Sequence, residues 1–278
     1  MKALIDGDVV TYQAGFASDI RKYHVNGYEF DYKKEALEHC KNTHSDPRYI
    51  TKTVTPEPIE HCLHSVKLMI ENMCEQIDAD QYVTYLTTTD PTFRHKMYTQ
   101  YKANRSGEKP LHYAEIRSYL QDHHNAVVTL GNEADDWMGL EQMDDLRNND
   151  FDPLKAETCI CTVDKDLNMI PGWHFNWRKE EMYWISQHDA DFFFWEQFLT
   201  GDTADNIPGI KGVGEKTAKK ILASCSTNQE AYDTVFGRWM DTKTATADAI
   251  HQVGDLLWIQ RHGASKWHND LGIQKFTS

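Results

Sequence analysis

The most informative stretch of the sequence reads Gly201-Asp202-Thr203-Ala204-Asp205-Asn206-Ile207-Pro208-Gly209-Ile210-Lys211-Gly212-Val213-Gly214-Glu215-Lys216-Thr217-Ala218. Pro208 and Gly209 are expected to end one helix, Gly212-Val213-Gly214 to form a tight turn, and residues 215–222 to start a second helix. Backbone N–H groups at such a turn are exposed where a phosphate can dock. The pattern is typical of a helix–hairpin–helix element that binds the DNA backbone.

The charges around this turn support the same interpretation. Four lysines against Glu215 give the segment a local charge of +3, and they are Lys211, Lys216, Lys219 and Lys220. Asp202 and Asp205 stand directly before the turn, three residues apart, which is the spacing of one helical face. A carboxylate pair joined to a glycine turn is far more specific than a Gly-x-Gly sequence alone.

Short apolar runs that lead into acidic residues recur along the earlier part of the chain. They lie at residues 3–5, 82–87, 126–130 and 158–163. Helix-like segments at residues 59–73 and 133–143 lie between them. Strands that alternate with helices predict an α/β domain with a mostly parallel sheet, whose ligand site lies beyond the carboxyl ends of the strands. After about residue 190 the strand signal stops, so we expect a second, helical lobe there.

The acids at these strand ends have spacings that bring them together. Glu133 and Asp136 share one helical face with Asp135 beside them, and Asp164 and Asp166 share one side of a strand end. Nine acids are expected to meet, namely Asp6, Asp90, Glu133, Asp135, Asp136, Asp164, Asp166, Asp202 and Asp205. Because crowded carboxylates raise one another's pKa, a cation must neutralise them. Oxygen ligands suit Mg²⁺ or Mn²⁺, and two ions about 4 Å apart support phosphodiester hydrolysis.

Residues 94–109 form a second basic segment. Five cations against Glu108 give it a local charge of +4, and they are Arg94, Lys96, Lys102, Arg105 and Lys109. Tyr98 and Tyr101 lie between the cations and offer aromatic faces to unstacked bases. We expect this segment to contact substrate; the alternative is a solvated helix face with core tyrosines.

Composition is consistent with a globular protein of 278 residues, with 40% hydrophobic and 26% charged residues. The formal net charge of −14 opposes nucleic-acid binding only if the acids are spread evenly, and their convergence on a metal site removes that objection. No run approaches the roughly 18–20 apolar residues of a membrane helix. The start of the chain lacks a signal-peptide core, and six cysteines in a chain of this length are expected to be reduced, so we expect a cytoplasmic protein.

These residues resemble the 5′-nuclease family, and within it the phage 5′→3′ exonucleases of the flap-endonuclease fold. The resemblance is carried in the family's order by Asp6-Gly7-Asp8, by Asp90 followed by Phe93-Arg94 and Tyr101-Lys102-Ala103-Asn104-Arg105, by Glu133–Asp136, by Asp164–Asp166 and by residues 201–217. It implies a Rossmann-like, PIN-like nuclease domain over residues 1–190, with an insertion at about 19–57 and a helical arch at about 91–125. A helical lobe over residues 191–278 would carry the helix–hairpin–helix element at about 199–222.

The resemblance also implies roles for individual residues. The first metal site would use Asp6, Asp90, Glu133, Asp135 and Asp136, and the second Asp164, Asp166, Asp202 and Asp205. Lys102 and Arg105 would contact the scissile phosphate and, with Asp6, Asp164 and Asp202, form the catalytic set. DNA contacts are expected at Arg94, Lys96, Tyr101, Lys102, Arg105, Gly209, Lys211, Gly212, Gly214, Lys216 and Thr217. A K⁺ ion at the glycine turn is a further expectation.

The function expected from the sequence is therefore a metal-dependent 5′→3′ exonuclease of phage DNA replication or recombination, with flap and RNA–DNA hybrid substrates left open. Two alternatives stand beside it. A haloacid-dehalogenase-type phosphatase would use Asp6 as a covalent nucleophile. A DNA-structure binder would keep the fold without hydrolysis. The role of Asp8, which replaces a neutral residue of many relatives, is left open, as are residues 223–278.

Overall fold

A computed structural model describes residues 1–105 and 107–275 of the chain. Its centre is a six-stranded sheet in which every neighbouring pair is parallel except the last, β8 with β9. In spatial order the strands are β6 (Val127–Val128), β5 (Gln81–Leu86), β1 (Lys2–Asp6), β7 (Thr158–Cys161), β8 (Gly172–Asn176) and β9 (Glu181–Ile185). The α/β fold with a mostly parallel sheet that the sequence predicts is confirmed.

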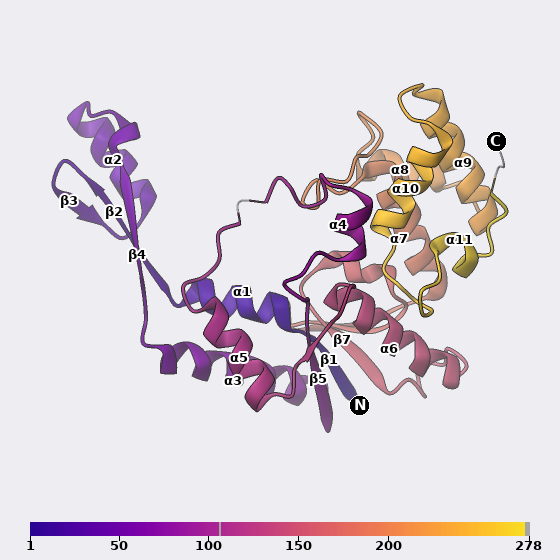
Figure 1. Cartoon of the computed structure of the whole chain (residues 1–278), viewed down its shortest axis with the longest axis horizontal. Helices are drawn as coiled ribbons and strands as arrows, with labels where there is room; N and C mark the ends of the chain where they lie inside the picture. The colour runs from indigo at the N-terminus through magenta and orange to yellow at the C-terminus, as the bar shows by residue number, and fades with distance from the viewer. Residues whose placement is uncertain (106, 276–278) are drawn as a thin grey trace.

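Helices cover both faces of this sheet (Figure 1). Alternate residues of β1 point to opposite sides: Ala3 and Ile5 join one buried cluster, while Leu4 joins the other. The first cluster lies under α1 (Gly7–Ala17), α3 (Ile59–Gln76) and α5 (Tyr113–His123), which contact one another. Helix α6 (Ala134–Asn148) covers the second. A strand that is buried on both faces has apolar residues at consecutive positions, and the sequence of β1 shows this pattern at residues 3–5.

Helix α3 illustrates how the apolar spacing sets the packing. Its buried residues are Cys62, Val66, Ile70 and Met73, which recur every three or four positions along one face. The helix expected over residues 59–73 is confirmed, with its end three residues later. Its buried stripe packs toward the sheet beside α1 and α5.

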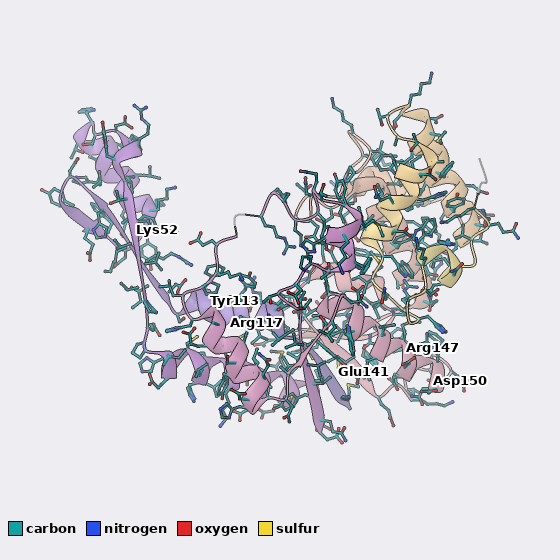
Figure 2. All side chains as sticks on the ribbon, viewed as in Figure 1. Lys52, Tyr113, Arg117, Glu141, Arg147 and Asp150 are labelled. Carbon is teal, nitrogen blue, oxygen red and sulfur yellow. The ribbon has the colours of Figure 1, made fainter. Side chains whose placement is uncertain are left out.

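The segment of residues 19–57, for which the sequence indicates no structure, forms a separate small sheet. Strands β2 (Asp19–Val25), β3 (Tyr28–Phe30) and β4 (Thr51–Pro56) pair antiparallel in the order β3-β2-β4, with α2 (Lys33–Thr43) and a short 3-10 turn, η1 (Pro47–Tyr49), between β3 and β4. The chain enters and leaves this insertion at one point, because Glu57 donates its N–H to the carbonyl of Ser18 at 2.8 Å. The insertion stands away from the main body (Figure 1), and Lys52 on β4 reaches Glu108 at 3.0 Å (Figure 2).

The arch expected at about residues 91–125 is mostly not helical. It begins with the short helix α4 (Phe93–Met97) and ends in α5, which belongs to the layer beneath the sheet. Between these helices the described residues form turns and irregular chain. Lys102 adopts a left-handed conformation with φ of 55°, which interrupts helical geometry within the basic segment.

The remaining elements build the helical lobe that the sequence predicts after residue 190. They are α7 (Gln187–Thr200), α8 (Glu215–Leu222), α9 (Asn228–Asp241), α10 (Ala247–Leu257) and α11 (Trp267–Asp270), while a 3-10 turn, η2 (Lys165–Met169), lies between β7 and β8 of the main sheet. An aromatic cluster that includes Trp195, Trp258 and Trp267 forms the centre of this lobe. The hairpin of β8 and β9 has no counterpart in the sequence-based assignment.

Two further observations concern the cysteines and the expectation that no helix spans a membrane. All six cysteines are free thiols, and four of them are buried. Within residues 1–105 and 107–275 there is no helix with both the length and the apolar character needed to span a lipid bilayer.

Candidate metal-dependent nuclease site

Asp6 ends β1 at the carboxyl edge of the parallel sheet. One carboxylate oxygen accepts the N–H of Val9 at 3.0 Å, and the other accepts the hydroxyl of Thr162 at 2.9 Å. The side chain is buried, and burial together with the charge of Asp8 raises its pKa to about 7. Both oxygens are thus held in place, which disfavours Asp6 as a covalent nucleophile.

Three more carboxylates gather beside Asp6 from two other segments. Asp135 lies in the first turn of α6, and burial together with Asp6 and Asp164 raises its pKa well above the usual range. Asp164 follows β7 and accepts the backbone N–H of Asp166 at 2.9 Å. Burial and the charge of Asp164 raise the pKa of Asp166 to about 7, although it also accepts a hydrogen bond from Gln197. Asp164 and Asp166 are aligned by a 3-10 turn and not by strand alternation as expected.

Asp202 and Asp205 lie on a loop and not on the helix that their spacing suggests. Helix α7 ends at Thr200, and Asp202 and Ile207 then exchange backbone hydrogen bonds that close the loop. One oxygen of Asp202 accepts the N–H of Ala204 at 2.7 Å, a local turn that this short acid favours. Asp202 and Asp205 therefore line the same cavity because of a turn, and not because they share one face of a helix.

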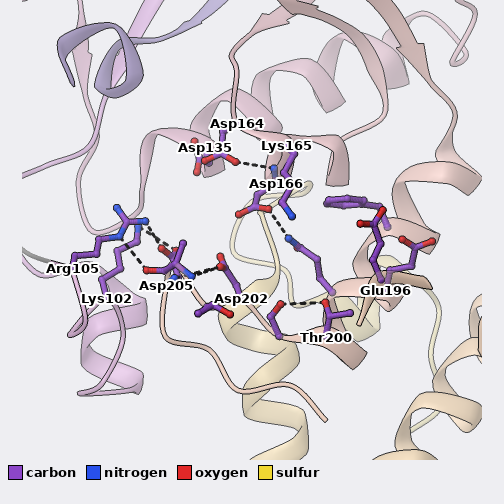
Figure 3. A pocket seen from close by; sticks show the side chains of 16 residues that line it. Lys102, Arg105, Asp135, Asp164, Lys165, Asp166, Glu196, Thr200, Asp202 and Asp205 are labelled. Carbon is purple, nitrogen blue, oxygen red and sulfur yellow. Dashed lines mark hydrogen bonds and ion pairs between the residues drawn. The ribbon is translucent and has the colours of Figure 1, made fainter. Parts of the chain in front are cut away.

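These acids line one cavity of about 560 Å³, seen in Figure 3. Asp135, Asp164 and Asp166 lie together on one side, and Asp202 and Asp205 lie across from them. Asp6 lines an adjoining cavity of about 210 Å³ that shares Asp135 and Asp164 with the first. Acids that are far apart in sequence therefore meet at the carboxyl edge of the sheet, as predicted.

Two cations of the basic segment stand at the wall of this pocket. Lys102 donates to Glu133 at 2.7 Å and lies 3.5 Å from Asp205, while Arg105 pairs with Asp205. Burial alone would lower the pKa of Lys102, but Glu133 and Asp205 raise it above its usual value. Against the effect of burial, Arg94 and Lys102 lower the pKa of Glu133 to about 2. Glu133 and Asp205 therefore each have a cation of the protein as a partner, whereas Asp6 and Asp166 have none within hydrogen-bond distance among the residues that the structure describes.

Arg94 and Asp136 do not occupy the positions expected for a DNA contact and a metal ligand. Arg94 is 3% exposed, and its guanidinium makes a double hydrogen bond to Asp136 at 2.7 and 2.9 Å. It also donates to the carbonyls of Leu256 and Trp258. Asp136 is fully buried and additionally accepts the N–H of Glu133 at 3.1 Å. The structure corrects both assignments: the pair joins α4, α6 and the end of α10.

Three other expected residues also lie elsewhere. Asp90 is exposed on the loop after β5 and lines none of the site cavities. Tyr101 is 4% exposed, and its hydroxyl oxygen lies 2.8 Å from a Glu133 carboxylate oxygen and 2.9 Å from one of Asp205, so its single proton can go to either acid and its ring is not available to bases. Lys96 is exposed on α4 outside the pocket, which is compatible with a contact to duplex DNA, so its expected role stays a prediction.

The turn at Gly212 and the helix after it, α8, are as the sequence predicts, but the preceding helix α7 ends at Thr200 and not at Pro208 and Gly209, because Gly201 caps it. The glycines of this segment differ in role. Gly209 packs against the backbone, since a β-carbon there would lie 2.0 Å from the carbonyl oxygen of Thr200. Gly212 has φ of 84° with open space around it, and Gly214 caps α8. Lys211, Lys216 and Thr217 are exposed around this turn. The N–H groups of Thr217 and Ala218 both donate to the carbonyl of Gly214 at 2.9 Å, so the two amides before them, of Glu215 and Lys216, are those that a helix start leaves available to an anion.

The pocket fits divalent cations by the chemistry of its donors. Its acids supply oxygen ligands, which are the type that Mg²⁺ and Mn²⁺ prefer. Burial raises the pKa of Asp6, Asp135 and Asp166, and neighbouring carboxylates raise these pKa values further, so a bound cation would stabilise the charged form of each acid. In the described part of the chain, however, no three Asp, Glu, His or Cys side chains already surround a single point where an ion fits. The nine-ligand shell expected from the sequence is thus not preformed.

Several residues at the site have no clear signal in the sequence. Gln197 on α7 reaches Asp166 at 2.6 Å, and Lys165 and Glu196 line the main cavity. Lys165 could have been noticed between two acids, whereas Gln197 lies in an ordinary helix. Asp8, whose role the sequence left open, pairs at 2.8 Å with Arg117 of α5, a residue labelled in Figure 2, and lines the same cavity as Asp6.

A parallel sheet with an acidic pocket at its carboxyl edge, followed by a helical lobe with an exposed glycine turn, defines the class of 5′-nuclease folds. Residues 196–261 match the family model described as 5′-3′ exonuclease, C-terminal SAM fold. The resemblance of this chain to that family, which its motifs indicated, is therefore confirmed.

Comparisons with individual proteins agree with this placement. The thermostable DNA polymerase I of Thermus aquaticus is 29% identical over 180 residues, which are 60% of this chain and 20% of that protein. The thermostable DNA polymerase I of Thermus thermophilus is 26% identical over 236 residues, 78% of this chain and 26% of that protein. The chain thus spans about a fifth to a quarter of the length of these relatives.

Solved structures establish the fold over nearly the whole chain. The T5 D15 protein co-crystallised with metal ions has a TM-score of 0.51 and 17% sequence identity, covering 92% of this chain and 95% of that chain. The D15 flap endonuclease of bacteriophage T5, in a pseudo-enzyme-product complex with DNA and metal ions, has a TM-score of 0.51 and 18% identity, covering 92% and 94%.

Proposed function

We propose that this protein is a divalent-metal-dependent 5′→3′ exonuclease that hydrolyses phosphodiester bonds of DNA. One observation carries the proposal: carboxylates from four separate segments line two adjoining cavities that share Asp135 and Asp164 and have Lys102 and Arg105 at their walls. The four segments contribute Asp6, Asp135, Asp164 with Asp166, and Asp202 with Asp205. Acids alone would repel a nucleic acid, whereas acids with two metal ions and two basic side chains can hold one.

The acids that fit the metal ions best are those not paired with a lysine or arginine of the protein. Asp6, Asp135, Asp164 and Asp166 form one group, and Asp202 faces them across the cavity. When bound, two divalent ions would lower the pKa of the attacking water and stabilise the charge on the leaving oxygen. Gln197 orients the carboxylate of Asp166, and Thr162 orients that of Asp6. These neighbours keep the ligands in position before substrate arrives.

The basic side chains supply the remaining electrostatic stabilisation. In the reaction, the oxygen of water forms a new bond to phosphorus, the bond to the 3′ oxygen breaks, and the product keeps a 5′ phosphate. Negative charge accumulates on the phosphate oxygens, and the Lys102 ammonium and Arg105 guanidinium can donate hydrogen bonds to them. Glu133 and Asp205 hold both cations at the pocket wall.

DNA with a free 5′ end is the substrate class that we propose, in line with the description of the matching family model as a 5′-3′ exonuclease. The bacteriophage T5 structure contains DNA and metal ions, and similarity to a phage protein supports a role in phage DNA replication or recombination. Duplex phosphates would bind the amides at the start of α8 and the exposed Lys211 and Lys216. A K⁺ ion at Gly212 is part of the same proposal.

Digestion of end-labelled duplex, nicked, flap and RNA–DNA hybrid substrates tests the proposal, each with Mg²⁺, Mn²⁺ or EDTA. We expect metal-dependent release from the 5′ end. Asp164→Ala and Asp202→Ala should abolish hydrolysis while DNA binding survives, and Lys102→Ala should slow cleavage by orders of magnitude. Lys67→Ala, an exposed lysine on α3, is the matched control and should cleave normally.

Two other results would replace the proposal. A phosphorylated Asp6 trapped during turnover of a phosphate ester would identify a phosphatase. Tight binding of branched DNA without cleavage under any metal condition would identify a DNA-structure binder. Near-normal cleavage by Asp164→Ala would remove that residue from the site.

A further inference from the structure

The base of the arch and the loop that carries Asp202 and Asp205 run against each other. We name them the arch base (residues 100–105) and the carboxylate loop (residues 201–207). The N–H of Lys102 donates to the carbonyl of Asp205 at 2.9 Å, and the Nε of Arg105 reaches the carbonyl of Ala204 at 3.5 Å. The two segments are about 100 residues apart in sequence, so these contacts are tertiary.

Two asparagine side chains join the segments from opposite sides. Asn104 of the arch base donates its amide to the carbonyl of Thr203 at 2.7 Å. Asn206 of the carboxylate loop donates its amide to the carbonyl of Gln100, also at 2.7 Å. Each segment thus supplies one amide donor to the backbone of the other, and the two bonds flank the Lys102–Asp205 contact.

Neither asparagine lines the cavities at the site, so neither faces the group of metal-binding carboxylates. Asn206 has φ of 58°, in the left-handed region that asparagine tolerates better than most residues. The backbone conformation and the side-chain bond are therefore both specific to this residue type.

Three side chains of the arch base also meet the carboxylate loop, but all at the single carboxylate of Asp205: the buried Tyr101 hydroxyl at 2.9 Å, Lys102 at 3.5 Å, and Arg105. Arg105 is 55% exposed, and a solvent-exposed ion pair contributes little and permits movement of long side chains. Hydrogen bonds between short amides and backbone carbonyls define the separation of the two chains much more closely. A misplacement of about 1 Å in a catalytic group can cost about 100-fold in rate.

We propose that Asn104 and Asn206 are positioning residues that set the distance between the cations Lys102 and Arg105 and the carboxylates Asp202 and Asp205. This inference rests on the proposed nuclease function. The two asparagines act through the backbone: they hold the arch base and the carboxylate loop as one unit, so that the cations and the metal ligands meet the same phosphate.

The test compares Asn206→Gly and Asn104→Ala with a matched control. Glycine accepts the positive φ of Asn206 and removes only the amide. Asn26→Gly is the control, because Asn26 also has a positive φ, of 53°, and donates its amide at 2.6 Å to Ser45, but lies in the insertion. Single-turnover cleavage at saturating substrate, DNA affinity in Ca²⁺ and the melting temperature are measured for each.

We expect Asn206→Gly and Asn104→Ala to lower the single-turnover rate about tenfold or more, with DNA affinity changed less than twofold. Asn26→Gly should match the parent. In a Lys102→Ala/Arg105→Ala background, Asn206→Gly should have little further effect, because its action passes through these two cations. A full additional tenfold loss in that background would overturn the proposal.

A second measurement needs neither metal nor activity. Trypsin can cleave after Lys102 and Arg105, and loosening of the arch base should accelerate this cleavage several-fold in Asn206→Gly and Asn104→Ala, but not in Asn26→Gly. Unchanged proteolysis together with parental cleavage rates refutes the positioning role while the nuclease function stands. A parent protein without hydrolysis refutes the proposed function itself, and accelerated proteolysis would still support the docking of the two segments.

Discussion

Replacing Arg94 by Met tests whether this arginine is a structural residue or a DNA contact. The substitution keeps much of the side-chain volume but removes five hydrogen bonds, two of which reach Asp136. Asp136 is fully buried, so its carboxylate would lose its charged partner without access to water. Breaking a buried ion pair from one side costs about 3–5 kcal/mol.

This cost corresponds to a decrease in melting temperature of about 5–9 °C for a chain of 278 residues. Urea unfolding followed by tryptophan fluorescence measures the free energy, and calorimetry measures the temperature. Lys96→Met is the matched control, because Lys96 lies on the same short helix but is exposed, and its replacement should cost less than about 0.5 kcal/mol. Adding Asp136→Asn to Arg94→Met should recover part of the stability, since a neutral amide does not require a charged partner.

Two outcomes of the Arg94→Met experiment would contradict a structural role for this arginine. If Arg94→Met unfolds like the parent but binds DNA much more weakly, the arginine contacts nucleic acid and its buried pairing with Asp136 does not describe the protein. If both stability and DNA binding are unchanged, the estimate for the buried pair is wrong.

Three further predictions follow from the site and its loops. Burial and nearby acids raise the pKa of Asp166 to about 7, so between about pH 4 and pH 7 the folded protein holds a proton that the unfolded chain has released. The metal-free parent should therefore lose stability as pH rises through this range, and Asp166→Asn should flatten that decline in urea titrations; an unchanged slope would contradict the pKa. Gly201→Ala should destabilise the protein more than Gly212→Ala, because both have positive φ but only at Gly201 would a β-carbon meet backbone, at 2.4 Å, while strain at Gly212 is limited to about 1–2 kcal/mol. Asp8→Asn should cost about 1–3 kcal/mol by weakening the bond to Arg117, yet leave the Mg²⁺ dependence of cleavage within twofold; a large shift in that dependence would make Asp8 a ligand.

The sequence predicts the sheet well because buried parallel strands have an unmistakable composition. Ala3-Leu4-Ile5 is apolar on both faces, and its end must place Asp6 at the edge where ligands bind. The helix from residue 59 is equally clear from its spacing. In contrast, the β8–β9 hairpin mixes polar and aromatic residues, and the insertion has no period that distinguishes it from a loop.

The site was harder to predict, because sequence spacing does not show which cation an acid meets. Asp135 and Asp136 are neighbours, yet one faces the pocket and the other is buried against Arg94. Arg94 and Lys102 both belong to one basic segment, but the tertiary fold buries the first and leaves the second at the pocket wall. Asp90 ends a predicted strand like the other acids, but its loop carries it into solvent.

The insertion of residues 19–57 is attached by neighbouring backbone positions, since Ser18 and Glu57 are hydrogen-bonded to each other. Such a module can be excised and its ends rejoined by a short glycine linker with little disturbance to α1 and α3, which it connects. The same junction is a natural place to graft a fluorescent or affinity domain onto the molecule, remote from the acidic pocket. Loss-of-module and gain-of-module versions of one enzyme would then isolate what these 39 residues add to substrate choice.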